Sequence, residues 1–167
     1  MPLNPKPGLV QPPATPFTIS SQALLDLLQA VLATGATFRF QARGGSMTPF
    51  IKDGDTVTVA PLTLCKPGMG KVAAFIQLES GRLVVHRIIG RRGDRYLIQG
   101  DNTAGQPDGW VVEQALLGII TRVERGGRRI YLGQGPERYM IAYLSRSGWL
   151  ARLGWRWHRL KQRFLPK

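Results

Sequence analysis

The sequence predicts a mostly β fold: a coiled antiparallel β domain with one short helix before it and a basic amphipathic helix after it. About seven short segments alternate apolar and polar residues or are continuously apolar, as β-strands are. Turns rich in glycine and proline separate these segments at close spacing. Short strands joined by close turns are typical of a single antiparallel β domain.

The chain of 167 residues is expected to form three regions: a proline-rich flexible tail over 1–17, a β-rich domain over 18–134 and a basic helical tail over 135–167. The first region lacks the apolar core of a signal peptide. The formal charge of +13 favours anionic partners, either anionic lipid or nucleic acid. The only cysteine, Cys65, excludes an internal disulfide and indicates a reducing compartment.

The first predicted helix begins at Ser20 or Ser21, either of which can cap it, and ends at Gly35. Its apolar residues fall on one face, so we expect the helix to pack on the sheet. At about 14 residues it is roughly 21 Å long, which is too short to cross the hydrocarbon core of about 30 Å. The residues of that apolar face are Leu24, Leu28, Val31 and Leu32.

The strands follow in order, each bounded by turn residues. A tight turn is predicted over 91–94, and the Gly126-Gly127 pair is expected to join the last two strands. The predicted strands are 37–41, 55–60, 71–78, 82–90, 96–99, 116–122 and 128–132.

The C-terminal tail is strongly basic and predicts a helix with two distinct faces. At about 100° per residue, aromatic and leucine side chains fall on one arc, and arginines line its edge. This pattern is typical of a helix that lies in the headgroups of an anionic membrane surface. A helix docked on the domain with its charges in water is the alternative, and nucleic acid is the least favoured partner. The predicted membrane-binding residues are Trp149, Arg152, Arg156, Trp157, Arg159, Arg163 and Phe164.

The candidate chemistry is centred on Ser46, in the stretch Gly44-Gly45-Ser46-Met47-Thr48-Pro49-Phe50. The glycines leave the serine hydroxyl uncrowded, and the proline favours a turn after it. His86 can serve as the base that a serine nucleophile needs, with Asp101 or Asp108 orienting the ring. The alternatives are a plain polar turn at Ser46, a structural histidine between Val84 and Ile88, and turn-forming aspartates.

At these residues the chain resembles a type I signal peptidase of the S26 family, within the wider S24/S26 group of serine peptidases. The resemblance covers about residues 36 to 123 and consists of short boxes in the family's order. They are Ser46-Met47-Thr48-Pro49 for the nucleophile, Gly54-Asp55 after it, Val85 to Asp94 for the base, Gly100-Asp101-Asn102, and the closing strand Leu117-Gly118-Ile119-Ile120.

Most bacterial members of that family carry lysine as the base, whereas His86 resembles the archaeal and endoplasmic-reticulum branch with its Ser-His-Asp arrangement. Asp108 falls where that branch places a second aspartate. The resemblance therefore implies a catalytic set of Ser46, His86 and Asp108, with Asp101 as the other candidate carboxylate and the residue expected to hold the loop.

The resemblance further implies a serine endopeptidase that cleaves a signal, leader or propeptide segment after small residues. The substrate is an extended peptide or preprotein that adds as a strand to a sheet edge. The oxyanion and the substrate backbone would be held around Gly45, Ser46 and Met47. No metal or cofactor is expected. Because no apolar run reaches membrane-span length, we expect a cytoplasmic or peripherally membrane-associated protein.

Two other interpretations remain open from the sequence. One is a LexA-like regulator that cleaves itself or a partner, in which lysine is the base and Lys71 would be the residue to test. The other is a non-catalytic basic protein that binds membrane or nucleic acid through its charge.

Overall fold

The computed structural model describes residues 20–77, 80–103 and 106–149. The proline-rich segment 1–17 and all but Trp149 of the predicted membrane-binding residues therefore lie outside the described residues. In chain order the elements are α1 (Ser21–Ala33), β1 (Phe38–Gln41), β2 (Thr56–Ala60), β3 (Val72–Gln77), β4 (Arg82–Arg92), β5 (Arg95–Gln99), β6 (Gly109–Val112), the short 3-10 helix η1 (Glu113–Ala115), β7 (Leu116–Arg125), β8 (Arg128–Ile130) and α2 (Arg138–Arg146).

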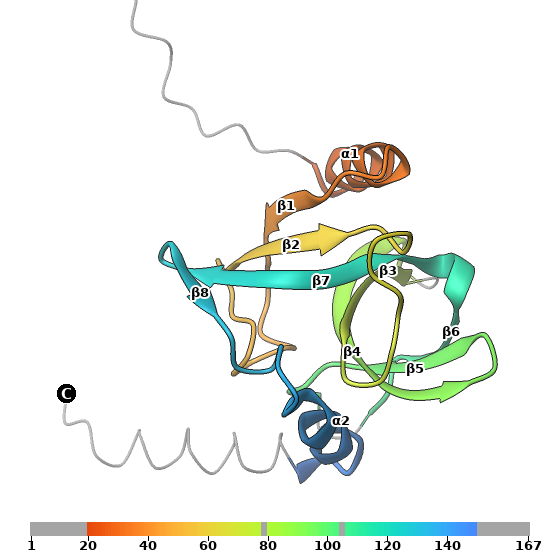
Figure 1. The fold of residues 1–167 in the computed structure, drawn as a ribbon, viewed down its shortest axis with the longest axis vertical. Helices are drawn as coiled ribbons and strands as arrows, with labels where there is room; N and C mark the ends of the chain where they lie inside the picture. Colours follow the sequence, from red (N-terminus) through yellow and green to blue (C-terminus); the bar gives the residue numbers. More distant parts are fainter. Residues whose placement is uncertain (1–19, 78–79, 104–105, 150–167) are drawn as a thin grey trace, which may run out of the picture.

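The strands form one curled antiparallel sheet in the order β1-β2-β7-β3-β4-β5-β6, and β8 pairs with β7 (Figure 1). The two helices lie at opposite ends of the molecule, α1 beside β1 and α2 beyond β5 (Figure 1). The predicted mostly β, coiled antiparallel fold is confirmed. The strand β4 is longer than predicted because the turn after it contains only Gly93 and Asp94, and Arg92 already pairs with Arg95.

The curled sheet buries both of its faces, which explains the continuously apolar segment at β3. Val72 and Ala74 point into one core cluster, and Ala73 and Phe75 point into a second cluster on the other face. Since neighbouring side chains of a strand alternate between faces, a strand with a core on each side has no polar positions. Leu28 of α1 is fully buried in the first cluster, so the predicted packing of this helix on the sheet is confirmed.

The long strand β4 has two halves with different neighbours. Over Arg82 to Arg87 it pairs with β3, and from Arg87 onward it also pairs with β5. Among the described residues, no strand pairs with the other edge of the segment Arg82–His86. This first half of β4 therefore presents an open edge of backbone N–H and C=O groups.

The sequence analysis did not identify β6, and it assigned 135–167 to a helical tail without distinguishing α2 as a separate packed helix. The strand β6 has four residues and pairs with β5 immediately after a turn. The helix α2 comes from the segment assigned to the basic tail, and it packs against β4 with Ile141, Ala142 and Ser145 buried. Within the described residues, no helix is long and apolar enough to cross a bilayer.

A buried ion pair fixes the chain where β2 begins. Asp55 is buried, with 2% of the residue exposed. Its carboxylate accepts two hydrogen bonds from Arg125, at 2.8 and 2.7 Å, and one from the Lys52 backbone N–H at 2.8 Å. Burial raises the pKa of Asp55, but the hydrogen bonds from Arg125 and Lys52 outweigh it, so that the pKa lies below its ordinary 3.8.

The lowered pKa of Asp55 predicts an acid-sensitive contribution to stability. A carboxylate with a depressed folded-state pKa stabilises the fold above its unfolded pKa of about 3.9, and this stabilisation is lost as the pH falls through the folded value. We expect Asp55→Asn to lower the free energy of unfolding at about pH 7 and to reduce its decline below about pH 4. Urea denaturation of both proteins across this range measures the effect; parallel curves would contradict it.

Candidate active site

The loop between β1 and β2 presents Ser46 between anchored neighbours. Gly44 adopts a positive φ of 90°, and its N–H donates to Asp53 Oδ1 at 2.8 Å. On the other side, Met47 is buried, and its carbonyl accepts the N–H groups of Phe50 and Ile51 at 3.1 Å each. The serine is thus held on a rigid turn although it lies outside any helix or strand.

The structure brings together three of the predicted residues. The Ser46 Oγ lies 2.8 Å from His86 Nε2, and His86 Nδ1 lies 2.6 Å from Asp108 Oδ2. The side chains of His86 and Asp108 are only 9% and 17% exposed. They come from separate elements: His86 from β4, where it pairs with Ala73, and Asp108 from the residue before β6, where its N–H donates to the Ile98 carbonyl.

These two contacts are compatible with a single tautomer of His86. When Nδ1 carries the proton it donates to Asp108, and Nε2 keeps a lone pair that accepts the Ser46 hydroxyl proton. The opposite tautomer would place a lone pair of Nδ1 against a carboxylate, which is repulsive. The arrangement therefore favours the imidazole form in which Nε2 can receive a proton from Ser46.

The backbone around Ser46 leaves donors free for a ligand. Among the described residues, the N–H groups of Gly45, Ser46 and Met47 donate to no protein acceptor. Asn102 holds the carbonyls of this turn: its N–H donates to the Ser46 carbonyl at 2.7 Å, and its Nδ2 donates to the Gly45 carbonyl at 3.3 Å. Because the carbonyl and the N–H of a trans peptide point in opposite directions, holding these carbonyls turns the Ser46 and Met47 N–H groups away from Asn102.

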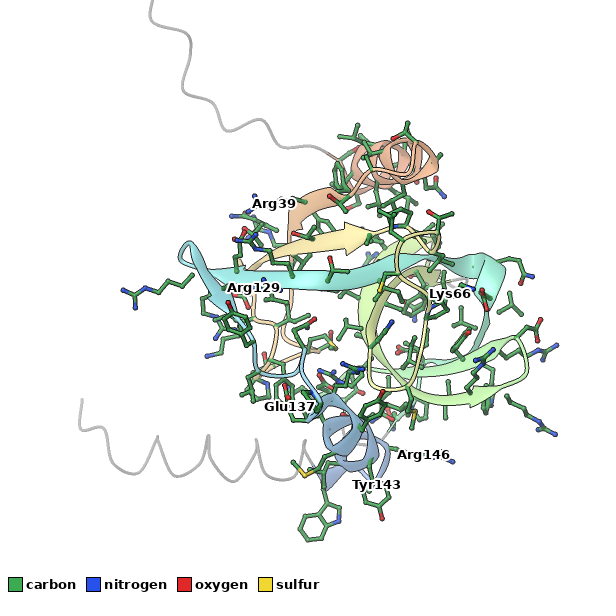
Figure 2. All side chains as sticks on the ribbon, viewed as in Figure 1. Arg39, Lys66, Arg129, Glu137, Tyr143 and Arg146 are labelled. Carbon is green, nitrogen blue, oxygen red and sulfur yellow. The ribbon has the colours of Figure 1, made fainter. Side chains whose placement is uncertain are left out.

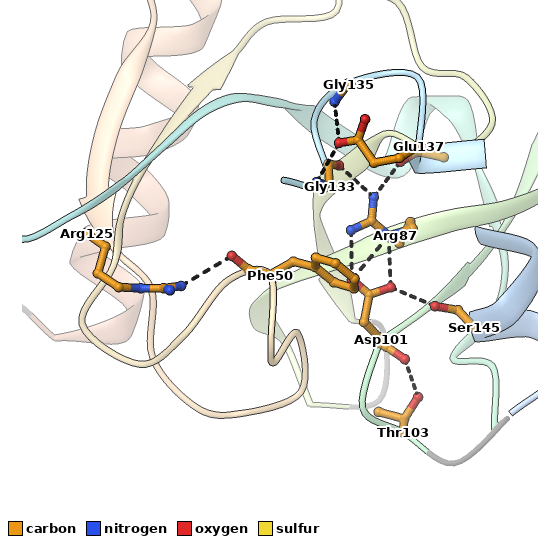
Figure 3. A network of polar contacts seen from close by, with 11 residues as sticks. Phe50, Arg87, Asp101, Thr103, Arg125, Gly133, Gly135, Glu137 and Ser145 are labelled. Carbon is orange, nitrogen blue, oxygen red and sulfur yellow. Dashed lines mark hydrogen bonds and ion pairs between the residues drawn. The ribbon is translucent and has the colours of Figure 1, made fainter. Parts of the chain in front are cut away.

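Asp101, the other candidate carboxylate, is occupied elsewhere (Figure 3). Arg87 donates to it from Nε at 2.8 Å and from Nη2 at 2.8 Å, and the Ser145 hydroxyl donates to it at 2.7 Å. The side chains of Arg87 and Asp101 are both fully buried. Within the described residues Asp101 has no contact with the His86 ring; it anchors the segment that carries Asn102.

The sequence analysis gave no role to Arg87, Asn102 or Ser145. Arg87 also donates from Nη1 to the carbonyls of Gly70, at 2.7 Å, and Gly133, at 3.0 Å. A single guanidinium thereby joins the turn before β3, the Asp101 segment and the connection into α2. The sequence contained one signal for Arg87, which directly follows the candidate base His86 in a predicted strand. Because neighbouring side chains of a strand point to opposite faces, Arg87 lies on the face opposite to His86.

The closest approach in the site is at Gly100. A Cβ on this residue would lie 2.9 Å from the Ser46 carbonyl oxygen, 3.1 Å from His86 Nε2 and 2.7 Å from the Thr103 methyl. These distances leave no space for a methyl group without moving the serine turn or the imidazole.

We therefore expect Gly100→Ala to lower peptidase turnover by at least tenfold while the protein still folds, because a shift of about 1 Å at reacting groups can cost on the order of 100-fold. Steady-state cleavage and thermal melting of the variant measure the two effects. Gly68→Ala is a matched control, since Gly68 likewise has no positive φ and a Cβ there meets only the Lys71 side chain, at 4.0 Å. Wild-type turnover in Gly100→Ala would contradict the predicted crowding.

Lys71, the alternative base, lies in a different place. Its Nζ donates to the Lys66 carbonyl at 2.7 Å and lies 3.5 Å from Cys65 Sγ. Lys71 and Cys65 line a separate cavity of about 540 Å³, whose lining includes neither Ser46 nor His86. The hydroxyl of Ser46 is instead bonded to His86. The interpretation with Lys71 as the base of Ser46 is therefore not supported.

An open groove of about 490 Å³ contains the Ser46, His86 and Asp108 side chains in its wall. One side of the groove is formed by residues 40–44, at the end of β1 and just after it, and the other by Leu83–His86 on the open edge of β4. Buried or half-buried apolar side chains form its floor: Phe40, Met47, Ile51, Leu83 and Val85.

Comparison with known proteins identifies a family of serine peptidases. The family model described as Peptidase S24-like matches residues 14–123, a range that includes α1, the serine turn, β4 and the whole of β6. No curated protein matches the sequence. Because the family model matches more than half of the 167 residues, the chain belongs to the Peptidase S24-like family and so to the S24/S26 superfamily of serine peptidases.

Proposed function

We propose that the protein is a serine endopeptidase resembling signal peptidase I, which cleaves an extended peptide after small residues through Ser46, His86 and Asp108. The observation that carries this proposal is the continuous pair of hydrogen bonds, 2.8 Å from Ser46 Oγ to His86 Nε2 and 2.6 Å from His86 Nδ1 to Asp108 Oδ2. A nucleophile, a base and an orienting carboxylate in this order are what acyl transfer requires.

In the proposed reaction the Ser46 Oγ attacks the scissile carbonyl carbon as its proton moves to His86 Nε2. The imidazolium, stabilised by Asp108, then gives this proton to the leaving amine nitrogen as the C–N bond breaks, which leaves an acyl-serine. A water molecule attacks the acyl carbon and gives a proton to His86. When the C–O bond to Ser46 breaks, His86 returns the proton to Oγ, and the enzyme is regenerated.

The free N–H groups of the serine turn are suited to hold the oxyanion. Donors aimed at the place where negative charge develops stabilise the tetrahedral intermediate, and losing one typically costs about 100- to 1,000-fold in turnover. Gly45, Ser46 and Met47 supply such donors, and Asn102 keeps the peptide planes of the Ser46 and Met47 N–H groups in position.

The groove favours an extended peptide as the substrate. A peptide strand can pair with the open edge at Leu83–His86, and its scissile carbonyl then lies beside Ser46. Alternate side chains of such a strand point to the apolar floor. Met47, Ile51 and Val85 give this lining an apolar character, which suits the small apolar side chains that the resemblance implies at the cleavage position.

The role proposed for Asp108 predicts a change in activity with little change in stability. We expect Asp108→Asn to lower turnover by about 10⁴-fold, because an amide can no longer hold the His86 tautomer. Its melting temperature should remain close to that of the wild type, since asparagine has nearly the same shape as aspartate and the backbone N–H keeps its bond to the Ile98 carbonyl. Cleavage of a fluorogenic peptide and thermal melting test both parts. A stable and fully active Asp108→Asn would remove this residue from the proposed set.

The proposed function is tested with a fluorophosphonate probe and an alanine-containing peptide substrate. We expect the probe to modify Ser46, identified by peptide mass spectrometry, and Ser46→Ala to lose both labelling and cleavage. Ser147→Ala is the control, since this exposed hydroxyl bonds only to the Leu144 carbonyl among the described residues. No modification at Ser46 together with no cleavage would overturn the proposal.

The same preparation separates a signal-peptidase-like enzyme from a LexA-like autoprotease, the alternative within the superfamily. The intact mass of the purified chain is followed over time without any added substrate. Fragments that appear in the wild type and not in Ser46→Ala would favour the autoprotease. A stable chain that cleaves added peptide favours the proposed endopeptidase.

A further inference from the structure

The outer side of α2 is unusually apolar for a surface helix. Tyr139, Met140 and Tyr143 are 52%, 62% and 70% exposed, and they lie opposite the buried Ile141 and Ala142 on the helix. Figure 2 places Tyr143 on the side of α2 that points away from the sheet. We call these three exposed residues, together with the exposed Trp149 that follows the helix, the α2 face.

The chain that carries this face is basic. Between residues 128 and 149 the sequence has four arginines and a single acidic residue, Glu137. Two of the arginines, Arg138 and Arg146, belong to α2 itself. The Glu137 carboxylate accepts the N–H groups of Gly133 and Gly135, at 2.8 and 2.9 Å, so its charge is bound to the backbone. On the face itself, the Arg138 guanidinium lies over the Tyr139 ring, 4.8 Å from its centroid.

We infer that the α2 face docks on an anionic lipid bilayer. Tyrosine, tryptophan and methionine with interspersed arginine suit the headgroup region, where rings are half in hydrocarbon and guanidinium groups meet phosphates. The sequence that continues from Trp149 has the same character: residues 150–167 contain four arginines, two lysines and no acidic residue. A partner protein with an apolar patch would not account for this excess of positive charge, whereas anionic lipid does.

The inner side of α2 connects this surface to the candidate active site. Ser145 donates to Asp101 at 2.7 Å, and the Ser145 carbonyl accepts from Gln99 at 2.7 Å. Asp101 is followed by Asn102, which holds the Ser46 turn. The helix is therefore part of the same packed unit as the site. Docking α2 on a bilayer consequently fixes how the groove is oriented relative to the membrane. The docking itself does not rest on the proposed peptidase function.

The docking is tested on the full chain with an environment-sensitive thiol probe at single positions. In a Cys65→Ser background, which removes the only cysteine, Met140→Cys places the probe on the α2 face. Leu64→Cys is the matched control, because Leu64 is 67% exposed and lies in the turn after β2, outside the α2 face. With vesicles containing about one third phosphatidylglycerol, the probe at 140 is expected to shift to the blue and the probe at 64 is not.

A second measurement removes the apolar character of the face. Co-sedimentation with the same vesicles should show at least a tenfold lower partition coefficient for Met140→Glu with Tyr143→Glu, and a change within about twofold for Leu64→Glu. Binding should also weaken with pure phosphatidylcholine and with added salt, because surface charges are screened beyond roughly 10 Å at 0.1 M. Thermal melting controls for folding, and both side chains are exposed.

Three outcomes would overturn the inference. The full chain does not bind anionic vesicles, or it binds while the probe at 140 stays unchanged, so that other residues carry the contact. Alternatively, the probe at 140 shifts to the blue without vesicles and in proportion to protein concentration, which would mean that a second copy of the chain covers the face. Each readout is independent of peptidase activity and can be repeated with Ser46→Ala.

Discussion

Replacing Ser46 by alanine is expected to lower kcat/KM for peptide cleavage on the order of 10⁴-fold or more, and replacing His86 by alanine should cost about as much. The double variant should be little worse than either single variant. The reason is the 2.8 Å contact between the two side chains: a hydroxyl without its base and a base without its hydroxyl are equally unable to form the acyl-serine. Steady-state kinetics of the three variants and the wild type measure this.

Lys71→Ala serves as the control for these variants, because its ammonium group is bonded to the Lys66 carbonyl, away from the serine. It should retain wild-type turnover. Losses in Ser46→Ala and His86→Ala that multiply in the double variant would show that the two residues act independently. If Lys71→Ala were inactive and His86→Ala remained active, the base would be Lys71 and not His86.

The largest expected effect on stability comes from the buried pair of Arg87 and Asp101. Arg87→Met or Asp101→Asn should each lower the free energy of unfolding by roughly 3–5 kcal/mol, because each leaves a buried charge without its partner. In Arg87→Met the carbonyls of Gly70 and Gly133 also lose a donor. Urea denaturation gives the change, and thermal melting should show a large fall in Tm in the same variants.

An exposed ion pair of the same protein provides the matched control. Arg43 and Asp53 are 3.9 Å apart with side chains 75% and 62% exposed, so Arg43→Met should change the free energy of unfolding by less than about 1 kcal/mol. Equal losses in Arg43→Met and Arg87→Met would mean that burial of the pair does not matter. Because Asp101 holds Asn102 beside the serine turn, the surviving fraction of Arg87→Met should also cleave more slowly.

Much of the β domain could be predicted from the sequence because its strands have a strong local pattern. The alternation at Thr56–Ala60 indicates a strand with one buried face, and the mainly apolar segment Val72–Gln77 indicates a strand with both faces buried. Ser46, His86 and Asp108 could be named as candidates because few residue types can serve as nucleophile, base and orienting acid. Their distances could not be predicted, since they depend on how β4, β6 and the serine turn meet in space.

The parts that the sequence analysis missed depend on contacts that are distant in the chain. The helix α2 is apolar on its outer side and buries small residues such as Ala142 and Ser145 on its inner side, so its pattern does not look like that of a packed helix. Ser145 gains its role only from Asp101, which is 44 positions away. The strand β6 is too short for periodicity to be visible.

The open edge of β4 has a further consequence for the solution behaviour of the protein. An unpaired strand edge is a template on which other copies can add, and such edges lead to aggregation in many β proteins. Here the edge at Leu83–His86 and residues 40–44 line the same groove as Ser46. A strand added by another copy of the chain would therefore occupy the place proposed for the substrate. Association of copies through this edge and binding of a peptide would compete.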